Sequence, residues 1–169
     1  MRRHIIAGIV ITLLAIVESS LLPLALGAAL RPNLTLVVCA AWAAIRGNEG
    51  FVWALGSGLL LDLQSGAPFG MHTAGLMIGN TLAALLDRAP IPIPILRTLN
   101  WVLVTTVVYY ITALIVLAFA SRPFDITIGF ANVALPNLAA NLILAIPAHL
   151  VLTQLQMRLR EQERFLPER

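Results

Sequence analysis

The chain has 169 residues, of which 59% are hydrophobic and only 11% are charged. A soluble domain carries about 25% charged residues, so this chain lacks the polar side chains that a water-facing surface needs. The composition therefore excludes an ordinary soluble protein, and the length leaves no room for a separate soluble catalytic domain. It predicts an all-α membrane protein in which residues 1–169 form one integral membrane domain.

All eleven basic residues are arginines, and the formal net charge is +3. These arginines lie at the ends of apolar runs, where they set membrane topology, and do not form one basic patch. We therefore expect no nucleic acid partner. The single cysteine, Cys39, lies within an apolar run and is interpreted as a small packing residue. We expect no cofactor and no metal.

The first apolar run spans residues 5–27 and follows a short basic start. A cleaved signal peptide is one interpretation, because Ala25-Leu26-Gly27 resembles a cleavage site. Glu18 and Pro23 interrupt the run, however, and further apolar segments follow. We therefore predict a retained first membrane helix.

Two short helices are predicted next, over residues 32–45 and 50–63, on either side of a polar turn at 46–49. Each has about 14 residues, whereas a full span needs about 20. Three interpretations remain: both helices lie deep in the bundle, the membrane thins around them, or they form a re-entrant hairpin.

A turn at residues 64–68 precedes a fourth predicted helix over 69–86. Prolines at every second position of residues 90–94 then predict an extended segment. A fifth helix over 99–120 is the clearest full-length span, and Trp101 near its start is expected to anchor it at the membrane interface.

The last apolar run, residues 127–155, is too long for one straight helix across the membrane. Either Pro136 and Pro147 kink it, or Pro136 begins the true span. Residues 156–169 form a charged tail that we expect to be a short frayed helix.

Six helices place both chain ends on one side of the membrane, and the arginines decide which side. Nine of them fall on the side of the chain ends, and two, Arg31 and Arg122, fall on the other. The positive-inside rule therefore predicts cytoplasmic termini. The nine are Arg2, Arg3, Arg46, Arg88, Arg97, Arg158, Arg160, Arg164 and Arg169.

Three sequence motifs carry a resemblance to a known family. They are Arg31-Pro32-Asn33-Leu34, the stretch from Gly58 to His72 that reads GLLLDLQSGAPFGMH, and Leu135-Pro136-Asn137. Together they resemble the MreD family of the bacterial rod-shape system, over the full length of the chain. The sequence departs from the family at Asn33, where Asp is frequent, and at Glu18, where a neutral amide is common.

The resemblance implies a multi-pass protein of the bacterial inner (plasma) membrane with no reaction of its own. It implies a six-helix bundle similar to the substrate-binding S-components of energy-coupling-factor transporters. The implied partner is MreC, in a complex with the RodA-type polymerase, a class B penicillin-binding protein and MreB. Membrane lipids surround the bundle.

Ionisable residues within membrane segments are candidates for function, because burying a charge in lipid is unfavourable. For Glu18 we weigh an interhelical hydrogen bond, or a protonated carboxyl near the headgroups, against a partner contact or a proton-linked role. Asp62 ends a helix, where its charge opposes the helix dipole. Its carboxylate is expected to accept the backbone N–H of Gln64 or Ser65, or to pair with Arg31.

His72 and His149 are each interpreted as hydrogen-bonded packing residues rather than ligands. Small residues recur every four positions at Gly50, Ala54 and Gly58, and again at Gly75 and Gly79, which favours close helix packing within the chain. The candidate structural or partner-contact residues are Glu18, Arg31, Pro32, Asp62, Gly66, Pro68, Gly70, His72, Pro136 and Asn137.

Enzyme motifs are missing from the sequence. The chain has no lysine for a phosphate-binding loop, no nucleophile elbow and no His-Glu pair at metal spacing. We therefore expect a non-catalytic scaffold subunit. The main alternative is the substrate-binding subunit of a vitamin transporter, although short outer loops disfavour a ligand lid. A membrane enzyme acting on lipids is a third alternative.

Overall fold

The computed structural model describes residues 2–21, 32–87, 91–120 and 130–165. These residues form six α-helices and two short π-helical turns, with no strand among them. The elements are α1 (Arg2–Ile16), η1 (Val17–Leu21), α3 (Leu34–Arg46), α4 (Asn48–Gln64), α5 (Met71–Leu86), α6 (Pro94–Phe119), η2 (Phe130–Ala134) and α8 (Leu135–Phe165).

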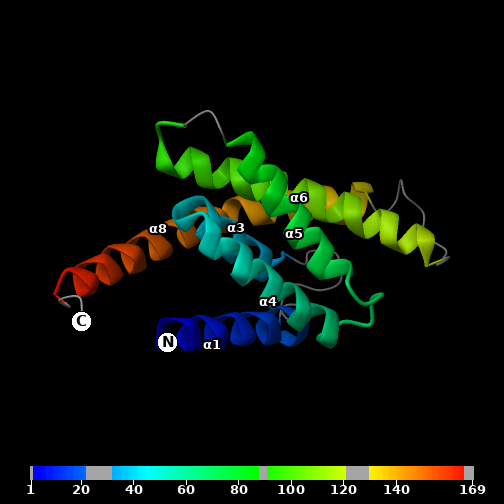
Figure 1. Ribbon diagram of the computed structural model, residues 1–169. Helices are drawn as coiled ribbons and strands as arrows, with labels where there is room; N and C mark the ends of the chain where they lie inside the picture. The colour runs from blue at the N-terminus through cyan, green and yellow to red at the C-terminus, as the bar shows by residue number, and fades with distance from the viewer. Residues whose placement is uncertain (1, 22–31, 88–90, 121–129, 166–169) are drawn as a thin grey trace.

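The short helix α3 forms the centre of the bundle and contacts α4, α6 and α8 (Figure 1). Its 13 residues span roughly 20 Å, which is less than the hydrocarbon core of a bilayer. Most of its side chains are buried, including Leu36, Val37 and Trp42. Because other helices enclose α3, little of its surface faces lipid, and a short helix is tolerated there.

Local sequence features fix where the helices begin. The Asn33 side chain accepts the Leu36 N–H at 2.7 Å and caps α3. Gly47 adopts φ +63° and reverses the chain between α3 and α4. Helix α6 begins at Pro94 rather than at the expected Leu99, because proline fits the first helical turn, where no N–H is needed.

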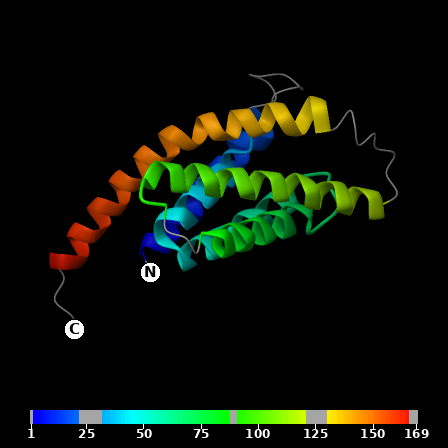
Figure 2. The same cartoon turned by 90° about the horizontal axis from the view of Figure 1, so that it is seen from above.

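The final helix also differs from the expectation. It begins at Leu135, so Pro136 lies in the first turn, which agrees with the second of the two interpretations above. The helix continues through Pro147 and through most of the expected tail to Phe165. Figure 2 shows its last turns extending beyond the rest of the bundle.

Small residues bring the helices together as the sequence predicted. A Cβ added to Gly58 would lie 2.5 Å from Thr73 Cα, and one added to Gly79 would lie 3.0 Å from Thr105 Cα. The close approaches join α4 to α5 and α5 to α6. The spacing of small residues therefore serves packing within the chain.

Trp101 corrects an expectation. Its side chain is only 2% exposed and packs with Ala43, Ala44 and Ala83 in the core, so it is not an interfacial anchor. The three alanines leave a space that the large indole fills.

The outward faces of the bundle are apolar. Leu103, Val107, Ile111 and Ile115 recur every four residues along α6 and are all exposed. Helix α6 and the segment Ala131–Leu159 are long and apolar enough to cross a membrane. The start of α1 and the end of α8 lie at the same end of the bundle in both ribbon views (Figures 1 and 2). We call the opposite end, where α4 ends and α5 begins, the far end.

Candidate functional site

Polar side chains gather at the far end, and Asp62 organises one part of them. Its buried carboxylate accepts the backbone N–H of His72 at 2.9 Å and that of Thr73 at 3.1 Å. The Thr73 hydroxyl donates to the same carboxylate. Asp62 therefore caps the first turn of α5, where the helix dipole favours a negative charge.

This geometry corrects the local turn expected for Asp62. The Ser65 N–H donates to the Leu61 carbonyl at 2.9 Å instead, because α4 continues to Gln64. The expected approach of Asp62 to Arg31 is outside the described residues, since Arg31 is not among them.

Glu18 does for α3 what Asp62 does for α5. One carboxylate oxygen of Glu18 accepts the Thr35 N–H at 2.9 Å, in the first turn of α3. The expected interhelical hydrogen bond is confirmed, and the dipole at the start of α3 favours a negative charge at this position. Pro32, one of the candidate residues, is buried just before this turn.

Buried amides link α3 to the two long helices. The Asn33 N–H donates to Asn141 Oδ1 at 2.9 Å, and Asn141 Nδ2 donates to Thr106 Oγ1 at 3.3 Å. These bonds connect the start of α3 to α8 and α6. Because water is scarce inside a membrane protein, such bonds satisfy groups that would otherwise be unpaired.

His72 lies where an aromatic cluster meets the start of α5. Its Nδ1 hydrogen-bonds the Tyr109 hydroxyl, so the expected hydrogen bond is present. The rings of Tyr109 and Tyr110 meet edge to face, with centroids 5.5 Å apart. His149 also has a partner, the Thr98 hydroxyl at 2.8 Å from its Nδ1.

These polar groups surround a cavity of about 310 Å³, which we call the vestibule. Helices α4, α5, α6 and α8 contribute to its wall, together with the two π-helical turns and Asn33, which caps α3. The lining residues are Glu18, Ser19, Asn33, Leu61, Gln64, Ser65, Met71, His72, Tyr109, Tyr110, Ala113, Val133 and Asn137.

The turn between α4 and α5 borders this site and projects outward. Leu63 and Phe69, on either side of the turn, are 73% and 70% exposed. Gly66 is exposed, and a Cβ added there would meet nothing within 4 Å, whereas Gly70 adopts φ +92°, which only glycine tolerates well. Pro68 is half-buried between them.

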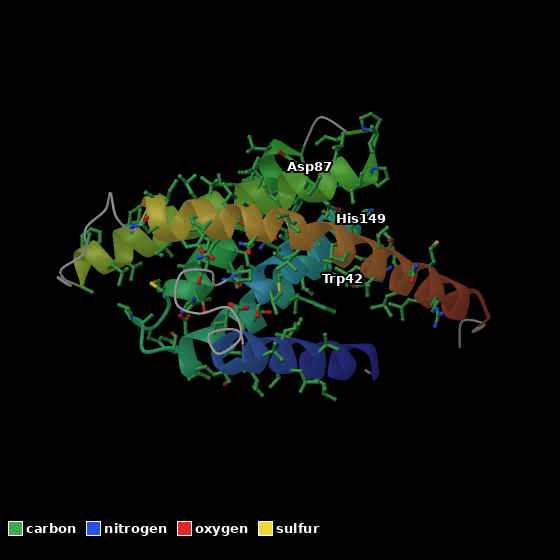
Figure 3. The ribbon with its side chains drawn as sticks, turned by 180° about the vertical axis from the view of Figure 1, so that it is seen from behind. Trp42, Asp87 and His149 are labelled. Carbon is green, nitrogen blue, oxygen red and sulfur yellow. The ribbon has the colours of Figure 1, made fainter. Side chains whose placement is uncertain are left out.

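The other end of the bundle carries a separate polar cluster. Arg97 pairs with the buried carboxylate of Asp87 at 2.6 Å, and Arg46 pairs with Glu49 at 2.9 Å. Trp42 stacks on Trp53, with ring centroids 5.1 Å apart. Figure 3 shows Trp42, Asp87 and His149 in the half of the bundle nearer the end of α8.

Sequence reasoning found some of the far-end residues and missed others. It singled out Glu18, Asp62, His72 and Asn137, which the structure brings to one end of the bundle. It missed the roles of Tyr109, Tyr110, Gln64 and Asn141. The spacing of Asn137 and Asn141, four apart on an apolar helix, was the available signal, because amides in lipid need partners.

The metal-binding chemistry of the site and three comparisons with known proteins bear on the identity of the chain. Among the described residues, no three His, Cys, Asp or Glu side chains gather as a metal site would require. A family model described as rod shape-determining protein MreD matches residues 1–159 of the chain. No curated protein and no solved structure gives a significant match.

Proposed function

The chain belongs to the MreD family of rod shape-determining membrane proteins, and we propose that it is a non-catalytic subunit of the bacterial cell-wall elongation complex that binds MreC. In this proposal it helps to organise the peptidoglycan synthases, a RodA-type polymerase and a class B penicillin-binding protein, together with MreB. It lies in the inner membrane with both termini in the cytoplasm.

The observation that carries the proposal, beyond family membership, is the exposed turn at the far end. Leu63 and Phe69 present large apolar side chains there, although nothing in the described chain covers them. Asp62 fixes one side of the turn, because its carboxylate accepts the N–H groups of His72 and Thr73 at the start of α5. A rigid turn with apolar side chains is suited to binding, because its groups are already ordered before the partner arrives.

Partner binding in a membrane depends on close packing and interhelical hydrogen bonds, since lipid is as apolar as the helices. We propose that the membrane helix of MreC, and the segment just outside it, dock beside residues 64–68 and the adjacent faces. Arg31 belongs to the same proposed surface on sequence grounds.

Gly66→Trp tests this proposal. A Cβ added at Gly66 would meet nothing within 4 Å, so we expect the backbone there to accept a tryptophan without rearrangement. We expect several-fold less MreC to co-purify from membranes, with insertion of the variant unchanged. Gly56→Trp on α4 is the matched control, because a Cβ added there also meets nothing within 4 Å. Normal recovery of MreC with Gly66→Trp would contradict the proposed docking surface.

The vestibule favours one second candidate, the substrate-binding subunit of an energy-coupling-factor type vitamin transporter. This second candidate includes the proposal that the six helices are arranged as in an S-component. This candidate predicts specific binding of a vitamin-sized molecule by the purified protein and co-purification with an ATPase module. Recovery of both without MreC would replace the scaffold proposal.

A further inference from the structure

The vestibule has a chemistry of its own that a scaffold role does not require. We propose that it binds a small molecule or headgroup carrying a compact organic cation, such as a primary ammonium group, which enters from the far end. Glu18 is the counterion in this proposal, and the ring of Tyr110 contacts the carbon atoms beside the charge.

The charge of the lining favours a cation over an anion. Glu18 is a carboxylate, and neither lysine nor arginine is found among the described lining residues. Gln64 and Asn137 add carbonyl oxygens that accept hydrogen bonds, and Ser19 and Ser65 add hydroxyls. Among the described lining residues a phosphate group would meet the carboxylate without a lysine or arginine to compensate it, whereas an ammonium group has several acceptors.

The position of Glu18 is fixed before any ligand arrives. Its Oε2 accepts the Thr35 N–H at 2.9 Å, which ties the carboxylate to the start of α3. The Ser19 hydroxyl donates to Gln64 Oε1 at 3.1 Å, which joins η1 to the end of α4. Both bonds hold the acceptors in the cavity wall. Binding therefore loses little side-chain conformational entropy.

The size and the aromatic lining favour an organic cation over a metal ion. A cavity of about 310 Å³ is at the small end of the range for organic ligands, which is about 300–1,000 Å³. Tyr109 and Tyr110 both line it, and aromatic ring faces attract organic cations. A metal ion would find only one carboxylate among the described lining residues, which is too few charged ligands.

Two polar atoms in the wall lack partners. His72 Nε2 and Ser65 Oγ are buried, and neither has a hydrogen-bond partner in the described part of the chain. Buried polar groups in proteins are usually satisfied, so both atoms are available to a molecule bound in the vestibule. A ligand with a hydroxyl or amine beside its charge has groups to pair with them.

The test uses the full-length protein in dodecyl maltoside micelles, which contain no lipid amines. In one arm, ethanolamine hydrochloride is titrated and binding is measured by calorimetry. In the other arm, a short-chain phosphatidylethanolamine is added instead. Saturable binding of ethanolamine supports a free solute, and binding of the lipid alone supports a headgroup. Absence of saturable binding in both arms would overturn the proposal.

Variants connect binding to the vestibule. Glu18→Gln keeps an acceptor for Thr35 but removes the charge, and we expect binding to weaken about tenfold to a hundredfold. Glu49→Gln, which removes a carboxylate at the opposite end, should leave binding unchanged. Unaltered binding by folded Glu18→Gln would contradict the proposal.

A second pair of variants decides the matter if Glu18→Gln does not fold. Tyr110→Phe keeps the aromatic ring and should bind within about twofold of the original protein, whereas Tyr110→Leu removes the ring and should bind severalfold more weakly. Equal binding by both variants would overturn the aromatic contact and with it the assignment of the site.

Discussion

The carboxylate of Asp62, near the end of α4, holds Thr73 in the first turn of α5 through both its backbone N–H and its hydroxyl. Glu18 accepts the backbone N–H of Thr35 at the start of α3. Each carboxylate comes from a segment that runs toward the far end, and it caps a helix that runs back. Charge inside an apolar bundle is therefore balanced by helix dipoles as well as by ion pairs.

The cap at Asp62 leads to a stability prediction. Asp62→Ala removes the acceptor for three donors, two of them backbone N–H groups, and should destabilise the protein by about 2–4 kcal/mol. Asp62→Asn keeps one acceptor oxygen, so its stability should lie between that of the original protein and that of Asp62→Ala. Thermal unfolding in detergent, followed by circular dichroism, measures the order of the three proteins.

Leu63→Ala is the matched control for the Asp62 variants, because Leu63 is the next residue and is largely exposed. It should unfold close to the original temperature. If Asp62→Ala were as stable as Leu63→Ala, the cap would not contribute measurably.

Packing between α5 and α6 depends on a small residue at Gly79. A Cβ there would lie 2.9 Å from Thr105 Cγ2 and 3.0 Å from Thr105 Cα. Gly79→Val should therefore push α5 and α6 apart and lower the free energy of unfolding by about 1–3 kcal/mol. Gly56→Val, where the added Cβ meets nothing, should remain monodisperse in size-exclusion chromatography while Gly79→Val does not.

The pair between Arg97 and Asp87 is asymmetric, since the Arg97 side chain is 41% exposed whereas that of Asp87 is 4% exposed. Arg97→Gln leaves a buried carboxylate without its partner and should cost about 1–3 kcal/mol, after allowance for the exposed guanidinium. Asp87→Asn should cost less, because the released guanidinium can turn into solvent.

The double variant Arg97→Gln/Asp87→Asn should be more stable than Arg97→Gln alone. Thermal unfolding of the original protein, the two single variants and the double variant gives a double-mutant cycle, which measures the coupling between Arg97 and Asp87. Simple additivity of the two single effects would show that the pair does not act as a unit.

Topology remains a prediction that reporter fusions can test. Fusions at Arg46, Arg88 and Arg169 should report the cytoplasm, because nine of eleven arginines fall on the side of the chain ends. A fusion at Gly66 should report the opposite side. A periplasmic signal at Arg169 would reverse or break the six-span topology.

The sequence by itself determined the helices and the family. Apolar runs and prolines located six helices, with their starts set by local features such as Asn33 and Pro136. Small residues four apart indicated which faces pack closely, as Gly58 and Gly79 show. These features are local, because helix formation and capping depend on residues within one or two turns.

Only the tertiary structure decided the partners of the polar groups. Asp62 is followed by a turn that could satisfy it locally, yet its carboxylate reaches His72 and Thr73 across that turn. Trp101 stands where an interfacial anchor belongs, yet alanines on two other helices leave a space for it in the core. Sequence spacing does not determine such contacts, because they depend on how the whole bundle packs, and an apolar environment leaves each polar group to find a partner within the protein.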